Sequence, residues 1–378
     1  SSRTLIKDIG VGKQQLVEIA KALAKNAKLL ILDEPTASLN EDDSKALLDL
    51  LLKFKKQGMT SIIISHKLNE ISYVADKITV IRDGSTIETL DKKKDDFSEQ
   101  RIIQGMVGRE MTDRFPKRPG VKIGDVSMEV KNWNVYHPLY TERKVVNDVS
   151  FKIHKGEVVG ISGLMGAGRT ETARALFGAD PKQSGKISVM GKDGQLHEVT
   201  INSPQDAVKY GIGYLSEDRR RYGCVVQKSV TENTTLATME EFTSGIFINK
   251  SKEKEVSEKY VKELATKTPN CEQLVVNLSG GNQQKVVIAK WLTRDSEILI
   301  FDEPTRGIDV GAKNEIYKLM NRLAAEGKSI IMISSEMTEV LRMSDRIIIM
   351  CEGKVTGCID ISEATQENIM DKATRNID

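Results

Sequence analysis

The clearest hydrophobic pattern in the chain alternates helical stripes with short apolar runs. Near the start, apolar residues recur at the i, i+3, i+4, i+7 spacing of an amphipathic helix at Leu16, Ile19, Ala20 and Leu23, and again at Leu47, Leu50, Leu51 and Phe54. Gly58 ends the second stripe. The runs at 29–33, 61–65 and 78–81 are typical of buried strands. Apolar strands separated by helices predict an α/β fold, with a mostly parallel sheet flanked by helices on both faces.

This order of elements occurs twice. Gly12-Lys13-Gln14-Gln15 corresponds to Gly281-Asn282-Gln283-Gln284, Asp33–Thr36 to Asp302–Thr305, and Gly84 to Gly353, all at one offset of 269 residues (302 − 33). A constant offset over such a stretch predicts two copies of one folded unit. We therefore expect the C-terminal remnant of a first domain at 1–92, a linker at 93–124 and a complete second domain at 125–378.

The second copy contains a glycine-rich turn from Gly163, and its equivalent would fall at position −106 (163 − 269), outside this sequence. We therefore expect the first copy to lack its phosphate-binding loop and to present an open sheet edge.

Composition narrows the range of partners. The chain is 39% hydrophobic and 29% charged, and 56 basic against 54 acidic residues leave a net charge of +2. This balance predicts a globular protein that lacks the strong electrostatic field of a protein that binds nucleic acid or a membrane surface. No apolar run is long enough to span a bilayer, so any membrane role would require a partner. The four cysteines form no C-x-x-C pair, and we expect them to be buried or inert.

The glycine-rich turn is the strongest chemical signal. Between a predicted strand at 158–162 and a predicted helix, the chain reads Gly163, Leu164, Met165, Gly166, Ala167, Gly168, Arg169, Thr170 and Glu171. This run fits G-x-x-x-x-G-[K]-[ST], except that Arg169 stands where lysine is expected. Backbone N–H groups would surround phosphates, and the Thr170 hydroxyl would reach Mg²⁺. The forked guanidinium of Arg169 holds phosphate differently from an ammonium, so binding with slower hydrolysis is expected.

A carboxylate pair follows the strand at 298–302. Asp302 is placed to hold Mg²⁺ through water, and Glu303 to orient or deprotonate a water that attacks in line. Asp33 and Glu34 are their counterparts in the first copy. Solvated or helix-capping carboxylates are the alternative, but the phosphate loop in the same copy argues against it.

The run Leu278-Ser279-Gly280-Gly281-Asn282-Gln283-Gln284 precedes a helix predicted at 285–292, and here the chain resembles the ABC ATPase family. The resemblance implies a P-loop NTPase fold of the ABC type, with an antiparallel β part and a helical signature subdomain. It also implies that Ser279, Gly280 and Gly281 bind the γ-phosphate of ATP held by an opposite domain, so that two ABC domains dimerise around ATP and Mg²⁺.

Further positions follow from the resemblance. His66 matches the switch histidine that contacts the γ-phosphate, whereas its repeat partner is Ser335. Glu217 falls in the glutamine loop, which touches the transmembrane partner, and Gly10 replaces the serine of the first signature. The ring under adenine could be Tyr136, His137 or Tyr140, and the sequence does not decide among them.

Within the family, the tandem arrangement, the turn G-L-M-G-A-G-R-T-E, the stretch 217–220 and the run 302–313 resemble bacterial ribose, galactose and xylose importers. The resemblance implies an ATPase that energises monosaccharide import through transmembrane permease subunits. A separate periplasmic or extracellular binding protein would deliver the sugar. The ATPase would lie peripherally on the cytoplasmic face of the plasma membrane and would have no nucleic-acid partner.

The importer resemblance also implies two unequal composite sites. A competent site would combine a first-domain phosphate loop, Asp33, Glu34 and His66 with residues 279–281. A degenerate site would combine residues 163–170, Asp302, Glu303 and Ser335 with residues 10–12. Only the degenerate site has all its parts in this sequence, so weak or absent ATPase activity is expected.

Two other functions are open. A soluble tandem ABC protein acting on ribosomes or nucleic acid would be expected to show a longer charged linker and a basic face. A non-hydrolysing nucleotide-sensing domain would use Arg169 and Ser335 as features of a sensor. The residues do not identify the sugar.

Overall fold

The fold was analysed in a computed structural model, which describes residues 5–6, 11–23, 27–36, 39, 41–65, 67–82, 84–107, 115–116, 118, 120–137, 142–245 and 247–374. The chain divides into two compact units, Ser1–Thr112 with Asp309–Gly311, and Asp113–Ile308 with Ala312–Asp378.

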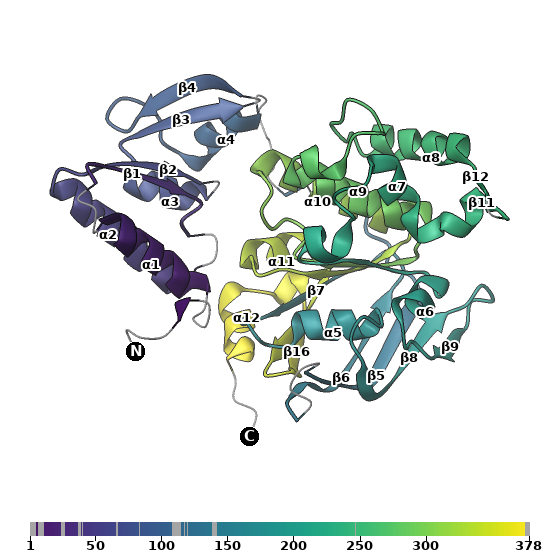
Figure 1. Ribbon diagram of the computed structural model, residues 1–378. Helices are drawn as coiled ribbons and strands as arrows, with labels where there is room; N and C mark the ends of the chain where they lie inside the picture. Colours follow the sequence, from purple (N-terminus) through teal and green to yellow (C-terminus); the bar gives the residue numbers. More distant parts are fainter. Residues whose placement is uncertain are drawn as a thin grey trace. The chain divides into compact units, whose positions relative to one another are not determined.

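In the first unit, the predicted helices and strands follow one another along the chain in the predicted order (Figure 1). Strands β1 and β2 pair in parallel, and β3 and β4 form an antiparallel hairpin. The elements are α1 (Val11–Leu23), β1 (Leu29–Asp33), α2 (Glu41–Lys56), β2 (Thr60–Ile64), α3 (Leu68–Val74), β3 (Lys77–Arg82), β4 (Ser85–Asp91) and α4 (Glu99–Val107).

The sheet of β1 and β2 is covered on one face only. Leu30 and Leu32 are buried against helices, whereas Leu29 and Ile31 are 48% and 62% exposed. Ile62 on β2 is also about half exposed, at 49%. The prediction of fully buried strands is therefore wrong here, because successive side chains of a strand point to opposite faces and only one face has a covering layer.

The stretch expected to be a linker, 93–124, contains packed segments. Helix α4 packs on β3, and its Ile102 is 1% exposed. Further along, the ring of Phe115 stacks on Tyr317 with the centroids 5.2 Å apart, and Arg118 pairs with Asp345. The part of the stretch that the structure describes thus includes a helix and an anchored segment.

The second unit is built on a six-stranded sheet in the order β10-β13-β14-β7-β15-β16. All neighbouring pairs are parallel except β15 with β16. Its four inner strands are almost wholly apolar and buried, as expected of a parallel sheet with layers on both faces. The strands are β7 (Val158–Gly163), β10 (Ile212–Leu215), β13 (Ile298–Asp302), β14 (Ser329–Ile333), β15 (Arg346–Cys351) and β16 (Lys354–Asp360).

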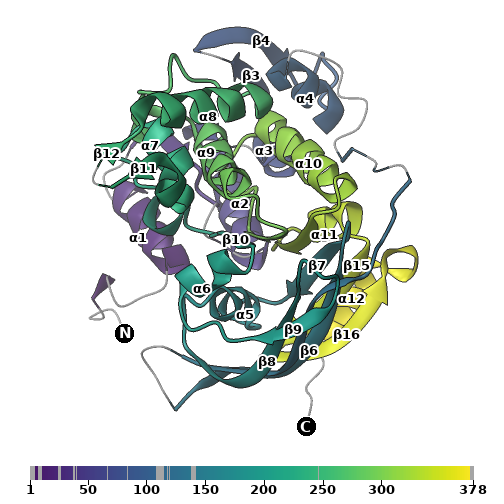
Figure 2. The same cartoon turned by 90° about the vertical axis from the view of Figure 1, so that its right-hand side faces the viewer.

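An antiparallel sheet in the order β6-β5-β8-β9 forms a second layer (Figure 2). Helix α5 contacts β5 and β6 as well as β7 and β13, so it lies between the two sheets. The bounds are β5 (Val126–Tyr136), β6 (Lys144–His154), α5 (Arg169–Leu176), β8 (Lys182–Met190), β9 (Leu196–Val199) and α6 (Pro204–Lys209).

Helices α7, α8 and α9 pack against one another as a separate group. Helix α9 is joined to the sheet by Trp291, whose Nε1 donates to the Tyr214 carbonyl at 2.9 Å. The remaining elements are the π-helix η2 (Arg219–Gly223), α7 (Val230–Thr235), η3 (Leu236–Phe242), β11 (Thr243–Ser244), β12 (Phe247–Ile248), α8 (Lys250–Glu263), η4 (Val275–Asn277), α9 (Gly280–Thr293), α10 (Val310–Ala325), α11 (Met337–Met343), η5 (Ile361–Glu363) and α12 (Gln366–Ala373).

The predicted fold class is confirmed: a mostly parallel sheet flanked by helices, an antiparallel part and a helical group. None of the helices that the structure describes combines the length and apolarity needed to cross a membrane. Cys224, Cys271 and Cys351 are buried as expected, but Cys358 is exposed because it lies on the outermost strand, β16.

Candidate nucleotide site

The glycine-rich turn joins the end of β7 to the beginning of α5. Gly163, Gly166 and Gly168 all have positive φ, at 155°, 81° and 92°. A Cβ on Gly168 would lie 2.6 Å from the Val145 carbonyl oxygen, whereas one on Gly166 would meet nothing within 4 Å. The turn is therefore fixed by close backbone contacts at its ends and open in its middle, where Met165 is 92% exposed. This leaves backbone N–H groups and the start of α5 accessible to an anion.

Arg169 is the first residue of α5, and its side chain crosses to the loop after β14. Its Nη1 donates to the Ser334 carbonyl at 2.9 Å. The sequence placed Arg169 in the phosphate loop but gave no sign of this contact. The bond ties the glycine turn to the segment that carries Ser335.

Thr170 and Asp302 come together beside the turn. Thr170 Oγ1 donates to Asp302 Oδ1 at 3.2 Å, and the hydroxyl of Tyr214 donates to Asp302 Oδ2 at 2.8 Å. Asp302 is fully buried, and this burial raises the pKa of its carboxyl. Tyr214 was missed by the sequence analysis, because a tyrosine in an apolar strand looks like a core residue until the fold brings it to Asp302.

Glu303 has a backbone with φ of 49°, and its N–H donates to the Ile333 carbonyl at 2.9 Å. Its Oε2 accepts a hydrogen bond from Ser335 Oγ at 3.0 Å. Burial raises the pKa of Glu303 to about 7, although the Ser335 hydrogen bonds and the positive charge of Arg169 act in the opposite direction. This carboxyl can therefore exchange a proton near neutral pH.

The counterparts in the first unit share part of this geometry. Glu34 also has a positive φ, 47°, and its N–H donates to the Ile64 carbonyl at 2.8 Å. Asp33 is exposed at the end of β1. His66 and Gly10 lie outside the described residues.

The predicted signature residues lie at the N-terminus of α9. Ser279 is the N-cap, and its Oγ accepts a hydrogen bond from Asn282 Nδ2 at 2.9 Å. A Cβ on Gly280 would lie 2.6 Å from Arg219 Nη2, and one on Gly281 would lie 2.7 Å from the Ala312 Cβ. The neighbours of Ser279–Gly281 thus belong to segments other than the glycine turn. The first backbone N–H groups of this helix are suited to anion binding.

The other predicted positions that the structure describes lie after β10 and at the end of β5. Glu217 follows β10, is partly exposed and pairs with Arg306. Tyr136 and His137 are half buried at the end of β5, and Tyr140 lies outside the described residues. The structure does not choose a ring for adenine.

The oxygen atoms of Thr170 and Asp302 fit Mg²⁺, which prefers hard oxygen ligands and usually keeps waters and substrate phosphates in its shell. Among the described residues, no group of three or more histidine, cysteine, aspartate or glutamate side chains forms a metal cage. Two protein oxygens beside a phosphate loop therefore suit an ion that arrives with a nucleotide.

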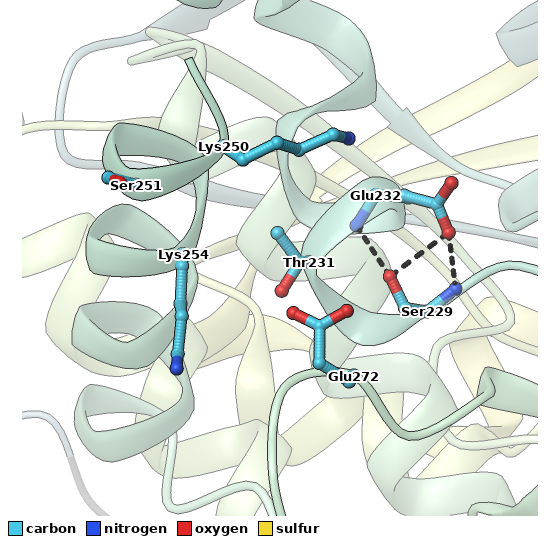
Figure 3. Close-up of a pocket in the computed structure, with 7 residues that line it drawn as sticks. All are labelled: Ser229, Thr231, Glu232, Lys250, Ser251, Lys254 and Glu272. Atoms are coloured by element: carbon cyan, nitrogen blue, oxygen red, sulfur yellow. Dashed lines mark hydrogen bonds between the residues drawn. The ribbon is translucent and has the colours of Figure 1, made fainter. Parts of the chain in front are cut away.

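A cavity of about 380 Å³ lies elsewhere, between α7 and the start of α8 (Figure 3). Glu232 and Ser229 form the capping box of α7 at its edge. It contains no residue of the glycine turn and no predicted site residue, so we assign it no part in nucleotide binding. It is lined by Ser229, Thr231, Glu232, Lys250, Ser251, Lys254 and Glu272.

The sequence profile of the ABC transporter family matches residues 2–37 and 146–306. The L-arabinose transport ATP-binding protein of Geobacillus stearothermophilus is 54% identical over 377 residues, which cover 99% of this chain and 72% of that protein. The xylose import ATP-binding protein of Thermoanaerobacter pseudethanolicus is 53% identical, over 98% of this chain and 72% of that protein.

Solved structures show the same fold. An ATP-binding cassette of an ABC transporter in its ADP conformation aligns with a TM-score of 0.53 at 22% identity, over 66% of this chain and 95% of the cassette. A dimeric cassette in a post-hydrolysis state, bound to ADP and phosphate, aligns with a TM-score of 0.52 at 19% identity, over 62% of this chain and 98% of that one.

Proposed function

The chain belongs to the ABC transporter family, and from that premise we propose that it binds and hydrolyses ATP to energise the import of a monosaccharide through a membrane permease. The proposal depends most on one observation: Thr170 Oγ1 and Asp302 Oδ1 lie 3.2 Å apart beside the glycine turn. The names of the relatives, which specify arabinose and xylose transport, support a monosaccharide as cargo.

The residues of the second unit divide the work. The backbone N–H groups of residues 163–171 hold the phosphates, and Thr170 and Asp302 hold Mg²⁺, which neutralises phosphate charge when it is bound. Glu303 orients the attacking water and accepts its proton. The water oxygen bonds to the γ-phosphorus as the bond from that phosphorus to the β–γ bridging oxygen breaks, so that ADP leaves. Its pKa of about 7 suits a general base that works near neutral pH.

The two sites of the assembled protein are unequal in this proposal. Ser279, Gly280 and Gly281 contact the nucleotide of a facing domain, together with Asp33, Glu34 and His66 of the competent site. Arg169 and Ser335 make the site of residues 163–171 slow. Residues 125–378 act as one nucleotide-binding domain, and residues 1–92 belong to another.

The partners follow from this activity. The domains pair around ATP and dock on transmembrane permease subunits through the segment of Glu217, and a separate binding protein outside the cell supplies the sugar. The protein lies peripherally on the cytoplasmic face of the plasma membrane, because it must reach both ATP and the permease.

A second candidate is a nucleotide sensor that does not hydrolyse. The bond from Arg169 to the Ser334 carbonyl favours it, because this bond joins the glycine turn directly to the loop that carries Ser335 and so links a binding loop to a second segment. In a sensor, Glu303 would have no chemical step to perform.

Single-turnover hydrolysis of Mg²⁺-ATP tests the proposal and separates the two candidates. We expect Glu303→Gln to slow hydrolysis at least about 100-fold while the affinity for a fluorescent ADP analogue stays within about twofold. The exposed Glu352→Gln is the matched control and should behave as wild type. Equal rates for wild type and Glu303→Gln would support the sensor. Absence of nucleotide binding to the folded wild-type chain would contradict both candidate functions.

A further inference from the structure

One arginine, Arg219, contacts a loop and the start of a helix that the proposed function uses for different tasks. It is the first residue of the π-helix η2, in the segment that follows β10. The loop that it contacts follows the Asp302–Glu303 pair. The helix is α9, whose N-terminus carries the phosphate-binding serine and glycines.

The guanidinium of Arg219 is bonded to consecutive backbone carbonyls. Its Nη1 donates to the Arg306 carbonyl at 3.0 Å, and its Nη2 lies 3.4 Å from the Gly307 carbonyl, a long hydrogen bond. Next to it, Glu217 pairs with the Arg306 side chain. The short segment 217–219 therefore contacts both the backbone of residues 306–307 and the side chain of Arg306.

The contact with α9 is steric. A Cβ on Gly280 would lie 2.6 Å from Arg219 Nη2 and 2.9 Å from the Gly307 carbonyl oxygen, so the Gly280 backbone packs directly against the guanidinium. Burial in this junction lowers the pKa of Arg219. A shorter side chain would leave the start of α9 without this support.

The rest of α9 is held independently. Lys290 Nζ donates to the Gly223 carbonyl at 2.6 Å, and Trp291 Nε1 donates to the Tyr214 carbonyl at 2.9 Å. These bonds lie about three turns along the helix from its first residue. Arg219 is thus placed to control the N-terminal turn without being needed to attach the helix.

We propose that Arg219 is a positioning residue that holds the Ser279–Gly281 end of α9 and the Arg306–Gly307 loop as one body. The inference rests on the proposed function, because residues 279–281 act there on the nucleotide of the facing domain. Arg219 acts on this nucleotide only through the backbone that it positions.

The test compares Arg219→Ala and Arg219→Lys with Arg220→Ala, which changes the exposed neighbouring arginine. Hydrogen–deuterium exchange of the full chain is followed at residues 279–284 and 304–309. The affinity for a fluorescent ADP analogue reports the glycine turn. The kcat/KM for ATP is measured with the chain assembled with its permease and facing domain.

For Arg219→Ala we expect about tenfold faster exchange in both segments and about tenfold lower kcat/KM, with the affinity for the ADP analogue within about twofold of wild type. Arg219→Lys should be intermediate, because its ammonium reaches one carbonyl where the fork reaches two. Arg220→Ala should match wild type in hydrogen exchange and in affinity for the ADP analogue, the two measurements that do not involve the permease.

Unchanged exchange in Arg219→Ala, or equal effects of Arg219→Ala and Arg220→Ala, would overturn the inference. A purely structural role would lower the melting temperature and leave the kcat/KM of the folded fraction unchanged, which would also overturn it. If Arg219→Ala does not fold, Arg219→Lys alone decides by the same measurements. Failure of the wild type to bind the ADP analogue would instead overturn the proposed function.

Discussion

At the residue scale, Glu303 links stability to pH. Its pKa is raised to about 7 from an ordinary value of 4.5, so the folded state binds the proton more tightly than the unfolded state. The resulting stabilisation is complete below about pH 4.5 and is lost as the pH rises through 7. We expect Glu303→Gln to be more stable than wild type by roughly 2 kcal/mol at pH 8, and by much less at pH 5.

Urea unfolding followed by tryptophan fluorescence at both pH values measures this difference. Trp133 and Trp291 both lie in the second unit, so the signal reports the unit that contains Glu303. Glu352→Gln removes an exposed carboxyl that lies in a turn, and it should leave the stability unchanged at both pH values. An equal gain for the two variants would show that the effect is one of net charge.

The glycines of the turn differ in what they tolerate. Gly166→Ala adds a Cβ that meets nothing, so only its left-handed backbone should cost stability, about 1 kcal/mol. Gly168→Ala adds a Cβ 2.6 Å from the Val145 carbonyl oxygen, which belongs to the backbone of strand β6 and cannot move freely. We expect a loss above about 3 kcal/mol, measured by the same urea unfolding. A loss for Gly168→Ala no larger than that for Gly166→Ala would contradict the close packing of the turn.

Motif spacing identified candidate residues by their own types, and it missed pairs of residues that the fold brings into contact. Thr170 and Asp302 were expected at the metal because a phosphate loop and a strand-end carboxylate have recognisable surroundings. The hydrogen bond from Tyr214 to Asp302 and the one from Arg169 to the Ser334 carbonyl join positions far apart in the sequence. Such pairs depend on sheet order, which no local pattern contains.

At the element scale, each copy contains a glutamate whose carboxylate accepts a hydrogen bond from another segment. In the second unit, Glu339 of α11 accepts hydrogen bonds from Thr305 at 2.5 Å, Tyr317 at 2.5 Å and Ser334 at 2.7 Å. In the first unit, Thr36 donates to Glu70 at 2.5 Å, at the equivalent positions (305 − 269 and 339 − 269). The repeat therefore conserves the link between the loop after the carboxylate strand and the helix after the next strand.

Tyr317 extends this link only in the second unit, where its equivalent position in the first is Leu48 (317 − 269). Tyr317→Phe keeps the ring and its stacking on Phe115 but removes a hydroxyl donor to the buried Glu339. We expect a loss of about 2 kcal/mol in urea unfolding, because hydrogen bonds to carboxylates are among the stronger ones. Tyr210→Phe, at a half-buried tyrosine, is the control, and we expect it to cost less than about 1 kcal/mol.

Helical periodicity predicted elements better than apolar runs predicted burial. The stripes ending at Leu23 and Phe54 lie within α1 and α2. The helix expected at 285–292 was found, but it begins earlier, at Gly280, because Ser279 caps it and the glycines form its first turn. The run at 61–65 was expected to be buried, yet Ile62 and Ile64 are 49% and 51% exposed. An apolar run identifies a strand, but its burial depends on elements that the run itself does not specify.

At the scale of the whole molecule, the two copies show how a covering layer determines the burial of equivalent strand pairs. Strands β1 and β2 correspond to β13 and β14, and both pairs are parallel. The positions Leu29, Ile31, Ile62 and Ile64, all about half exposed or more, correspond to Ile298, Ile300, Ile331 and Ile333, each no more than 1% exposed. The side chains at these four positions are apolar in both copies, so the difference arises from the strands and helices around them.

Equivalent substitutions in the two copies therefore test the origin of this burial. Ile331→Thr places a hydroxyl in the core and removes apolar volume, and we expect it to cost about 3 kcal/mol in urea unfolding followed by tryptophan fluorescence. Ile62→Thr changes an exposed side chain on a strand, and hydrogen exchange at residues 29–33 should reveal a loss below about 1 kcal/mol. Because Ile62→Thr makes the uncovered face less apolar, it should also reduce the binding of a hydrophobic dye, whereas wild type binds it. Equal losses of stability at the two positions, with unchanged dye binding, would mean that the face of β1 and β2 is covered in solution.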